Sequence, residues 1–404
     1  MTSTATHATV QLTHDLPRTA DLVIVGGGII GAATAFFAAR AGLHPVVIER
    51  RPALCSLTTP ASTGAFRAQF DNPEELALVR EGITLFEHFA EVTGLAGYDL
   101  ALRQQGYLWL TTTAAGVRRQ EALVARQREW GLDDVELLSG DEARARFPYL
   151  APAVAGARYR AGDGWLDVRR LTMGYAAASQ ASFIPNTAVT GFDLAGGRLH
   201  GVVTTRGAIS TDHAVIAAGP FSGVVAGLAE VDVPLALVRR QKLIMPEVPE
   251  VPADAPMTID EETGAHWRPA LHGAYLLWTA PGVAPGPPLD DVPTSADFAF
   301  GLLDPASPHA VASISPFWRT VWARNTSHWF LQAGQYAYTP DHRPFLGPTP
   351  VAGLYVNCGY SGHGIMAGTG GSRLTVDTLT GALAPAANPF RLDRPVVARE
   401  LDIL

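Results

Sequence analysis

The apolar positions near the start of the chain form an unbroken run instead of an alternating pattern. Residues 22–25 are all apolar and mostly β-branched, which is typical of a strand buried on both faces of a parallel sheet. Three glycines follow at 26–28, and an alanine-rich stretch at about 29–41 predicts a helix that Gly42 closes. A second apolar strand is predicted at 45–49. The pattern therefore predicts strand, turn, helix and strand, the opening unit of an α/β fold.

Later segments add to this outline. Residues 186–219 read as a β-meander that ends in a buried strand. Over 353–380 we expect another strand, a glycine-rich loop and a long helix. Residues 117–147 are charged and predict helix, whereas residues 281–297 are rich in Pro, Gly and Asp and predict a long surface loop.

The composition excludes several classes of function. The chain has 404 residues and a formal net charge of -8, so it lacks the basic character that nucleic-acid binding needs. Lys242 is its single lysine, which excludes most Schiff-base and Walker-type lysine chemistry. Cys55 and Cys358 are too few for a disulfide framework or a zinc cluster, and the histidines show no metal-ligand spacing, so no metal is expected.

The expected compartment is the cytoplasm. Two cysteines without a disulfide framework fit a reducing environment. The first 20 residues have no charged and apolar signal-peptide pattern, and we expect them to form a flexible arm. The uncharged run 22–39 is long enough to suggest a membrane span, but its glycines divide it into strand and helix, so no span is predicted.

The first glycine cluster has the spacing of a dinucleotide-binding turn. Gly26 permits the tight turn, Gly28 lets the backbone approach a pyrophosphate, and Gly31 lets helix and strand pack closely. Glu49 ends the second strand, where a carboxylate can bind the hydroxyls of an unphosphorylated adenosine ribose. The motif alone does not separate NAD from FAD. The meander, which leads into Ala218 and Gly219, favours FAD.

The C-terminal glycine loop supports the same cofactor. Gly359, Gly362 and Gly364 give a backbone that can lie against a flat ring, and the positive N-terminus of the following helix would stabilise a reduced flavin anion. Ser361 is not a hydrolase nucleophile, because His363 occupies the place of the second glycine of that motif. His363 could hydrogen-bond the flavin or the substrate, or be a packed loop histidine.

Taken together, these motifs resemble a known family. The N-terminal glycine motif, Ala-Ala-Gly-Pro-Phe-Ser at 217–222, the Tyr-Thr-Pro-Asp segment at 338–347 and Gly-Tyr-Ser-Gly-His-Gly at 359–364 look like the D-amino-acid oxidase superfamily. Within it, the chain is most similar to the branch of sarcosine oxidase β-subunits and dimethylglycine dehydrogenases. The resemblance implies FAD and the oxidation of a C–N bond by hydride transfer to flavin N5.

The resemblance also implies the architecture. We expect an α/β chain, α+β overall, in which a Rossmann-type FAD-binding domain with an inserted β-meander is interleaved with a substrate domain built on an antiparallel sheet. The FAD-binding domain is expected to comprise residues 21–90, 153–228 and 333–385. The substrate domain is expected to comprise residues 91–152, 229–332 and 386–404.

Single positions can be carried over from the family. Ser62, Thr63 and Gly64 resemble a loop that crosses the flavin pyrophosphate, and Val189 resembles a residue whose backbone meets the adenine. The residues expected to bind FAD are Gly26, Gly28, Ile29, Gly31, Glu49, Arg50, Ser62, Thr63, Gly64, Val189, Ala218, Gly219, Gly334, Gly359, Tyr360, Ser361, Gly362, His363, Gly364 and Ile365.

Arg67 resembles an arginine that binds the substrate carboxylate, a task that suits a bidentate guanidinium, although a surface salt bridge is an alternative reading. Arg268 could hold an anionic substrate group, and Tyr336 could line the pocket. Tyr107 and Gln335 are further pocket candidates, and ordinary packing is the alternative for each. The catalytic candidates are therefore Arg67, His363, Arg268 and Tyr336.

The chain also departs from the family. Gly334 occupies the place of the cysteine that attaches flavin covalently in some members, and neither cysteine of this chain falls in an attachment position, so the FAD is expected to be non-covalent. Two lysines of the sarcosine oxidases correspond to Met366 and to a position near Leu277. These differences leave open whether the substrate is a simple α-amino acid and whether oxygen is the electron acceptor.

The function expected is oxidation of a secondary or tertiary amine, such as an N-methyl or cyclic amino acid. Its partners would be the amine and oxygen or another acceptor, and a homo- or hetero-oligomer is open. One alternative is a 2-hydroxy acid dehydrogenase, in which His363 or His266 would act as the base. Another is a flavin-binding assembly protein without turnover, which a pocket sealed by Trp and Tyr side chains would support. An NAD-dependent dehydrogenase is disfavoured.

Overall fold

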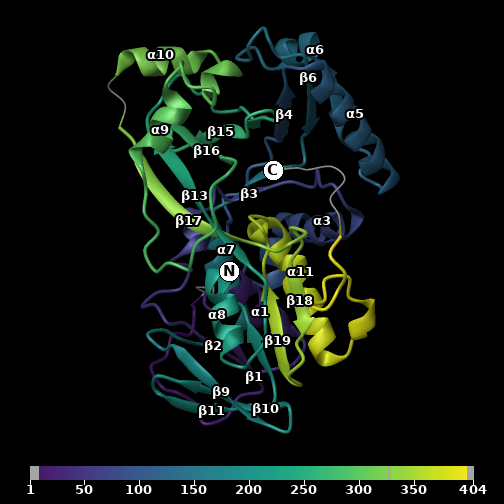
Figure 1. Ribbon diagram of the computed structural model, residues 1–404, viewed down its shortest axis with the longest axis vertical. Coiled ribbons are helices and arrows are strands. Elements are labelled where there is room, and N and C mark those ends of the chain that lie inside the picture. Colours follow the sequence, from purple (N-terminus) through teal and green to yellow (C-terminus); the bar gives the residue numbers. More distant parts are fainter. Residues whose placement is uncertain (1–8, 326–327, 398–404) are drawn as a thin grey trace, which may run out of the picture.

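The computed structural model describes residues 9–325 and 328–397. Two large sheets form the molecule, and the chain crosses between them several times (Figure 1). The lower sheet in Figure 1 has six strands in the order β18, β19, β12, β1, β2, β8. Their bounds are β1 (Leu22–Val25), β2 (Pro45–Ile48), β8 (Ser182–Ile184), β12 (Ala214–Ile216), β18 (Phe345–Pro348) and β19 (Leu354–Cys358).

The six-stranded sheet is parallel except at one edge. β8, β2, β1, β12 and β19 run parallel, and β18 joins β19 antiparallel. β1 lies in the middle with all four residues buried, which explains its unbroken apolar run. Helices cover one face, where α1 contacts both α7 and α11, and α11 contacts α3. They are α1 (Ile29–Arg40), α3 (Pro73–Glu87), α7 (Val168–Ser179) and α11 (Gly364–Thr380).

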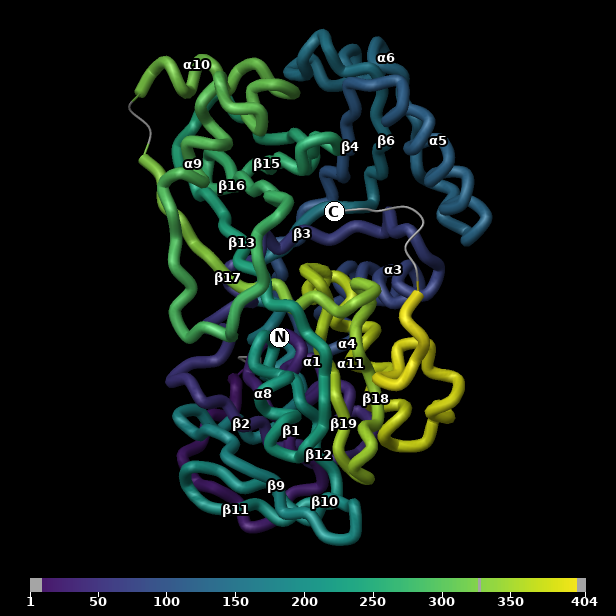
Figure 2. Tube along the Cα trace, viewed as in Figure 1, coloured from purple at the N-terminus to yellow at the C-terminus, as the bar shows by residue number. Residues whose placement is uncertain are grey.

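A three-stranded antiparallel meander covers the opposite face of this sheet (Figure 2). It consists of β9 (Val189–Ala195), β10 (Arg198–Thr204) and β11 (Gly207–Ser210). Its inward residues Leu199, Val202 and Ile209 join Val23 and Ile216 of the large sheet in one buried cluster. The meander predicted for residues 186–219 is therefore present.

The upper sheet has eight strands in the order β17, β13, β16, β15, β14, β4, β6, β5. Neighbouring strands are antiparallel except β14 and β4, which are parallel, so the predicted antiparallel sheet contains one parallel pair. The strands are β4 (Tyr107–Thr111), β5 (Glu136–Ser139), β6 (Gly156–Arg160), β13 (Ala236–Met245), β14 (Met257–Asp260), β15 (Ala265–Ala270), β16 (Gly273–Trp278) and β17 (Phe330–Tyr338).

Short elements complete the described chain. A two-stranded ribbon lies between the two large sheets, formed by β3 (Ala65–Phe66) and β7 (Gly164–Trp165). The upper sheet carries α5 (Ala114–Glu129), α6 (Gly140–Arg146), α9 (Ala296–Leu303) and α10 (Phe317–Arg324). The other helices are α2 (Thr58–Ala61), α4 (Phe89–Thr93), α8 (Ser222–Gly227) and 3-10 turns at Gly219–Phe221, Val311–Ser313 and Pro385–Ala387.

Most predicted elements lie within a few residues of their expected places. α1 ends at Arg40, two residues before Gly42, and α11 ends at Thr380, followed by the cap residue Gly381, whose φ of 79° is left-handed. The continuous helical reading of residues 117–147 was wrong in its middle. There β5 pairs with β6, and Ser139 starts α6 with a capping box that includes Glu142.

The predicted domain boundaries stay a prediction. β6 and most of β17 lie in ranges that the sequence assigned to the FAD-binding domain, and both pair within the eight-stranded sheet. Of the predicted N-terminal arm, residues 1–8 lie outside the described residues. Leu12 bridges to Phe183 and Thr19 bridges to Ser210, so this part of the arm lies against β8 and β11. Within residues 9–325 and 328–397, none of the helices combines the length and apolar character that crossing a membrane requires.

Candidate functional site: three connected cavities

Three cavities follow one another from the edge of the parallel sheet to the eight-stranded sheet. The first cavity lies at the ends of β1 and β2 and beside the start of α1. The second lies between α2, β17 and the loop before α11, and it shares Ile29, Thr59 and Gly219 with the first. The third reaches into the eight-stranded sheet and shares Tyr336 and Gly362 with the second. Together they form an elongated site.

The glycine turn of the first cavity is shaped by close backbone contacts. A Cβ atom at Gly26 would lie 2.4 Å from the Ala217 carbonyl oxygen, and one at Gly31 would lie 1.8 Å from the Gly26 carbonyl oxygen. A Cβ atom at Gly28 would point to the cavity side, 3.3 Å from Thr59 Oγ1. Glycine at these positions therefore brings the backbone and the N-terminus of α1 directly to the cavity, which suits a pyrophosphate.

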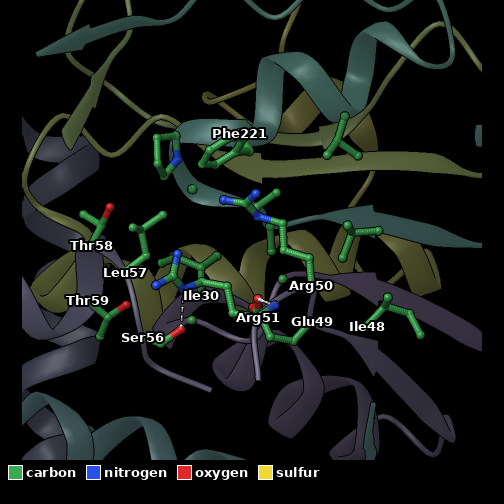
Figure 3. Close-up of a pocket in the computed structure, with 18 of the residues that line it drawn as sticks. Ile30, Ile48, Glu49, Arg50, Arg51, Ser56, Leu57, Thr58, Thr59 and Phe221 are labelled. Carbon is green, nitrogen blue, oxygen red and sulfur yellow. Dashed lines mark hydrogen bonds between the residues drawn. The ribbon is translucent and has the colours of Figure 1, made fainter. Parts of the chain in front are cut away.

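Glu49 stands at the end of β2 and lines the first cavity (Figure 3). Its Oε2 accepts a hydrogen bond from Gly27 N at 2.7 Å, and its Oε1 accepts one from Arg51 N at 2.8 Å. The backbone therefore fixes the carboxylate in place, while each oxygen keeps a further lone pair. This orientation suits the recognition of ribose hydroxyls.

Two arginines connect the first cavity to the loop that follows β16. Arg50 lies over the ring of Phe221, with its guanidinium carbon 3.8 Å from the ring centre, and it forms an ion pair with Asp290. Arg51 donates to Ser56 Oγ at 3.1 Å and to the Asp290 carbonyl oxygen at 2.9 Å. Figure 3 shows Arg50 beside Phe221 and Arg51 beside Ser56. Residues near Asp290 are thus tied to the rim of this cavity.

The second cavity is bounded by the glycine loop before α11. Gly359, Ser361 and Gly362 have left-handed φ angles of 73°, 52° and 99°, which explains why glycine dominates the loop. A Cβ atom at Gly362 would lie 2.4 Å from Tyr336 Cε2, so Tyr336 packs directly on this backbone. α11 begins here without an acidic residue in its first turn, and its positive end faces the cavity.

The third cavity has a volume of about 480 Å³ and contains three of the four catalytic candidates, Arg67, His363 and Tyr336. Its aromatic side chains leave this volume open, which argues against the alternative of a flavin-binding assembly protein without turnover. Arg67 is buried and lies over the rings of Phe70 and Trp109, with its guanidinium carbon 4.7 and 5.2 Å from their centres. Its Nη1 donates to the Gln69 carbonyl oxygen at 3.0 Å.

His363 links Arg67 to a buried carboxylate. Its Nε2 lies 3.4 Å from Arg67 Nη2, and its Nδ1 lies 3.5 Å from Glu75 Oε1. Asn72 holds the other carboxylate oxygen, since its Nδ2 donates to Glu75 Oε2 at 2.7 Å. A proton on Nδ1 would face the carboxylate and leave the Nε2 lone pair for Arg67, so Glu75 favours that tautomer. The three side chains hold the guanidinium at the cavity wall.

His266 also lines the third cavity. Burial, with a smaller contribution from the nearby Arg67, lowers its pKa to about 4. Its Nδ1 lies 2.9 Å from the Gly264 carbonyl oxygen, so the proton of the neutral ring lies on that side. The imidazole is therefore uncharged at neutral pH and keeps an acceptor on Nε2.

Arg268 lies in a different, fourth cavity with Lys242. Its Nε donates to the Thr63 carbonyl oxygen at 3.0 Å, and its Nη2 donates to the same oxygen. Lys242 Nζ donates to the carbonyl oxygens of Pro60 at 3.1 Å and Ser62 at 2.8 Å. Arg268 and Lys242 thus hold the backbone of residues 60–63, which also lines the second and third cavities.

The structure brings most of the predicted FAD-binding residues together. Those that line the first or second cavity are Gly26, Gly28, Ile29, Glu49, Arg50, Ser62, Val189, Ala218, Gly219, Gly334, Gly359, Tyr360, Ser361, Gly362, Gly364 and Ile365. Thr63 and His363 line the third cavity. Gly31 and Gly64 lie against backbone carbonyls of Gly26 and Leu166 and support the site through packing.

Several lining residues were not predicted. They include Arg51, Ser56, Leu57, Thr58 and Thr59 between β2 and the end of α2, and Phe221 after the Ala-Ala-Gly turn. Their position directly after a predicted strand end was a usable signal, because ligands of open α/β sheets bind at such ends. Of the further pocket candidates, Tyr107 lines the third cavity and Gln335 the second.

The residues present fit FAD. The first cavity offers a glycine turn, a helix N-terminus and an oriented carboxylate for an adenosine diphosphate, and the second offers a flat glycine backbone and a helix N-terminus for a ring. Gly334 lies at the second cavity without a side chain, and the thiol pKa of Cys358 is raised to about 12 by burial. A thiol held in this protonated state is a poor nucleophile, which supports non-covalent binding.

Comparisons with known proteins show which proteins this chain is similar to. The chain is 27% identical over 372 residues to "Sarcosine dehydrogenase, mitochondrial" of Homo sapiens, covering 88% of this chain and 39% of the relative. It therefore spans only part of the length of that relative. It is also 27% identical to "Sarcosine oxidase subunit beta" of Arthrobacter sp, covering 93% of this chain and 90% of the relative.

Solved structures share the fold. L-proline dehydrogenase from P. horikoshii superposes with a TM-score of 0.81 at 24% identity, over 93% of this chain and 98% of the other. Glycine oxidase from Geobacillus kaustophilus superposes with a TM-score of 0.79 at 25% identity, over 94% of this chain and 100% of the other. The family model described as "FAD dependent oxidoreductase" matches residues 21–378. The chain belongs to this family, the DAO family of FAD-dependent oxidoreductases.

Proposed function

We propose that this chain oxidises the C–N bond of a secondary or tertiary amine that carries a carboxylate, such as an N-methyl or cyclic amino acid. The observation that carries the proposal is the third cavity, which the buried Arg67 guanidinium lines. Tyr336 and Gly362 line both this cavity and the second one, so the two cavities adjoin. FAD, when bound, supplies the acceptor for a hydride. The names of relatives and structural neighbours, which include sarcosine and proline dehydrogenases, support this substrate class.

Residues of the chain would bind and orient the amine. Arg67 would take the carboxylate through two parallel hydrogen bonds, and His363 with Glu75 behind it would keep the guanidinium in place. Tyr107, Trp109 and Tyr336 would exclude water around the reacting carbon. Catalysis would then consist mainly of positioning.

The charge of the third cavity would also keep the amine reactive. Positive charge near an amine disfavours its protonated form, and among the described residues that line this cavity there is no carboxylate to stabilise an ammonium group. The substrate would therefore bind with its nitrogen lone pair available. That lone pair forms the C=N bond as the hydride leaves the neighbouring carbon, and water hydrolyses an acyclic iminium.

The visible spectrum of the anaerobic holoprotein tests the reaction class. Sarcosine, N,N-dimethylglycine and proline are added separately, and glycolate and lactate serve as hydroxy-acid counterparts. At least one amine should bleach the flavin, while the hydroxy acids should not. Bleaching by hydroxy acids alone would refute amine oxidation.

One observation favours the second candidate, oxidation of a 2-hydroxy acid. His266 is neutral in the third cavity and keeps an acceptor nitrogen, so it could accept a hydroxyl proton. For that function, His266→Asn should lower kcat strongly with a hydroxy acid. The cytoplasmic location, the electron acceptor and an assembly with a partner subunit stay predictions.

A further inference from the structure

A second arginine, Arg240 of β13, lies at the boundary between the second and third cavities and lines both. The strand pairing places it opposite Gly334 of β17. Its Nη1 donates to the Ala280 carbonyl oxygen at 2.9 Å, and its Nη2 donates to the Tyr338 hydroxyl at 3.1 Å. These bonds fix the guanidinium, and each Nη atom carries a second N–H. Within the described part of the chain, no carboxylate pairs with Arg240.

The third cavity has a consistent positive charge. Its described lining contains the guanidinium groups of Arg67 and Arg240 and neither Asp nor Glu. Tyr336 lies within electrostatic reach of both arginines: burial raises its pKa to about 12, and both Arg240 and Arg67 act to lower it. Arg67 already feels the carboxylates of Asp163, Asp71 and Glu75, which lie outside this lining. Arg240 has no paired carboxylate in the described chain, so an anionic group of the ligand would supply its counter-ion in the cavity.

We propose that Arg240 binds a second anionic group of the substrate. The substrate would then be an N-carboxyalkyl amino acid, with one carboxylate at Arg67, the other at Arg240 and the amine nitrogen between them. This inference rests on the proposed function, because it concerns the substrate of the same site. It also assigns to Arg240 a role in specificity, since a monocarboxylate analogue makes only one of the two charge pairs.

Two ether ligands, which have no amine nitrogen to be oxidised, test the inference through their binding affinities alone. Diglycolate and methoxyacetate have the same central geometry and differ by one carboxylate. Isothermal titration calorimetry of the holoprotein should show diglycolate binding about 10-fold tighter or more, the range expected for one charge-assisted contact. In Arg240→Gln, diglycolate should lose most of this preference while methoxyacetate changes about 2-fold or less.

Arg239→Gln is the matched control. Arg239 is the neighbouring residue of β13, donates to the Pro293 carbonyl oxygen and does not line the third cavity. It should leave both affinities unchanged, and the flavin content of each protein is compared by absorbance. Arg240→Lys keeps the positive charge but cannot form two parallel hydrogen bonds, so it should retain part of the preference for diglycolate. It replaces Arg240→Gln as the test variant if Arg240→Gln fails to fold.

The outcomes separate this inference from the proposed function. Equal affinities of the wild type for the two ethers, or equal weakening of both in Arg240→Gln, would overturn the role of Arg240. A preference for diglycolate that depends on Arg240 supports it, even if no amine bleaches the flavin and the proposed function fails. Conversely, rapid bleaching by sarcosine without any effect of Arg240 on the diglycolate preference would leave amine oxidation standing and refute the second anion site.

Discussion

At the scale of single residues, the site depends on a guanidinium held rigidly in a buried wall. Arg67 lies on Phe70 and Trp109 and next to His363, which itself contacts Phe70 edge-on at 4.9 Å between ring centres. Burial lowers the pKa of Arg67, yet arginine stays charged at neutral pH. A carboxylate that reaches Arg67 therefore meets a donor whose orientation is already fixed, and the cost of ordering the side chain on binding is small.

Arg67→Met should weaken the binding of carboxylate-bearing ligands far more than that of neutral ones. Loss of one charge-assisted contact predicts an increase in Kd for methoxyacetate of about 10- to 100-fold. A neutral ether such as 1,2-dimethoxyethane should change little. Calorimetry on the variant with full flavin content checks this, and an equal loss for charged and neutral ligands would show that Arg67 is structural.

At the scale of elements, the loop between β16 and α9 is joined to side chains that line the first and second cavities. It is fastened at several points: Arg50 and Arg51 bind Asp290, Gln335 Nε2 donates to the Pro287 carbonyl oxygen at 2.8 Å, and Gln335 Oε1 accepts from Leu289 N at 2.7 Å. These contacts join the loop to both β2 and β17. The loop is therefore positioned to slow the departure of a bound cofactor.

Asp290→Ala should speed FAD dissociation modestly. Its carboxylate is exposed, and ion pairs of this kind contribute up to about 1 kcal/mol, so we expect a rate increase of about 2- to 5-fold. The release of FAD after dilution can be followed by its fluorescence. Asp291→Ala is the matched control, because Asp291 is exposed and forms no described ion pair. Identical FAD dissociation rates in the two variants would show that the Asp290 contacts do not slow the release of FAD.

At the scale of the whole molecule, the eight-stranded sheet is joined to the backbone of residues 60–63, at the end of α2. Lys242 and Arg268 come from the eight-stranded sheet and bind carbonyl oxygens of this segment, which in turn borders the second and third cavities. Burial, together with the nearby charges of Arg268 and Arg169, lowers the pKa of Lys242 to about 7. This contact therefore contains a group that titrates near neutrality.

Stability should depend on pH through Lys242. Between pH 7 and the ordinary lysine pKa of 10.5, the unfolded chain binds a proton that the folded chain has lost, so the free energy of unfolding rises with pH. The slope approaches about 1.4 kcal/mol per pH unit, and below pH 7 the full cost of the buried charge is present. Lys242→Met should lack this slope in urea titrations from pH 6 to 9.5. Parallel curves for wild type and variant would contradict the assignment.

The sequence predicted what depends on local spacing. Gly26, Gly28 and Glu49 belong to one strand–turn–helix–strand unit, so their meeting followed from the pattern alone. The resemblance placed Arg67 and His363, which the fold brings together in the third cavity. Arg240 was missed because its position depends on the register of β13 with β17. Asp290 was missed because it lies in a loop whose path no periodic pattern predicts. Arg268 was expected near the substrate, but although it shares its face of β15 with His266, it lies further along the strand and lines the fourth cavity.

The most direct test of the account is one anaerobic mixing of the holoprotein with sarcosine, in which the flavin absorption and the product are followed together. We expect at least one secondary or tertiary amino acid to remove the oxidised flavin spectrum, and sarcosine oxidation to give glycine and formaldehyde in equal amounts, one of each per flavin reduced. A flavin that stays oxidised with sarcosine and with every other secondary or tertiary amino acid offered would contradict amine oxidation at this site.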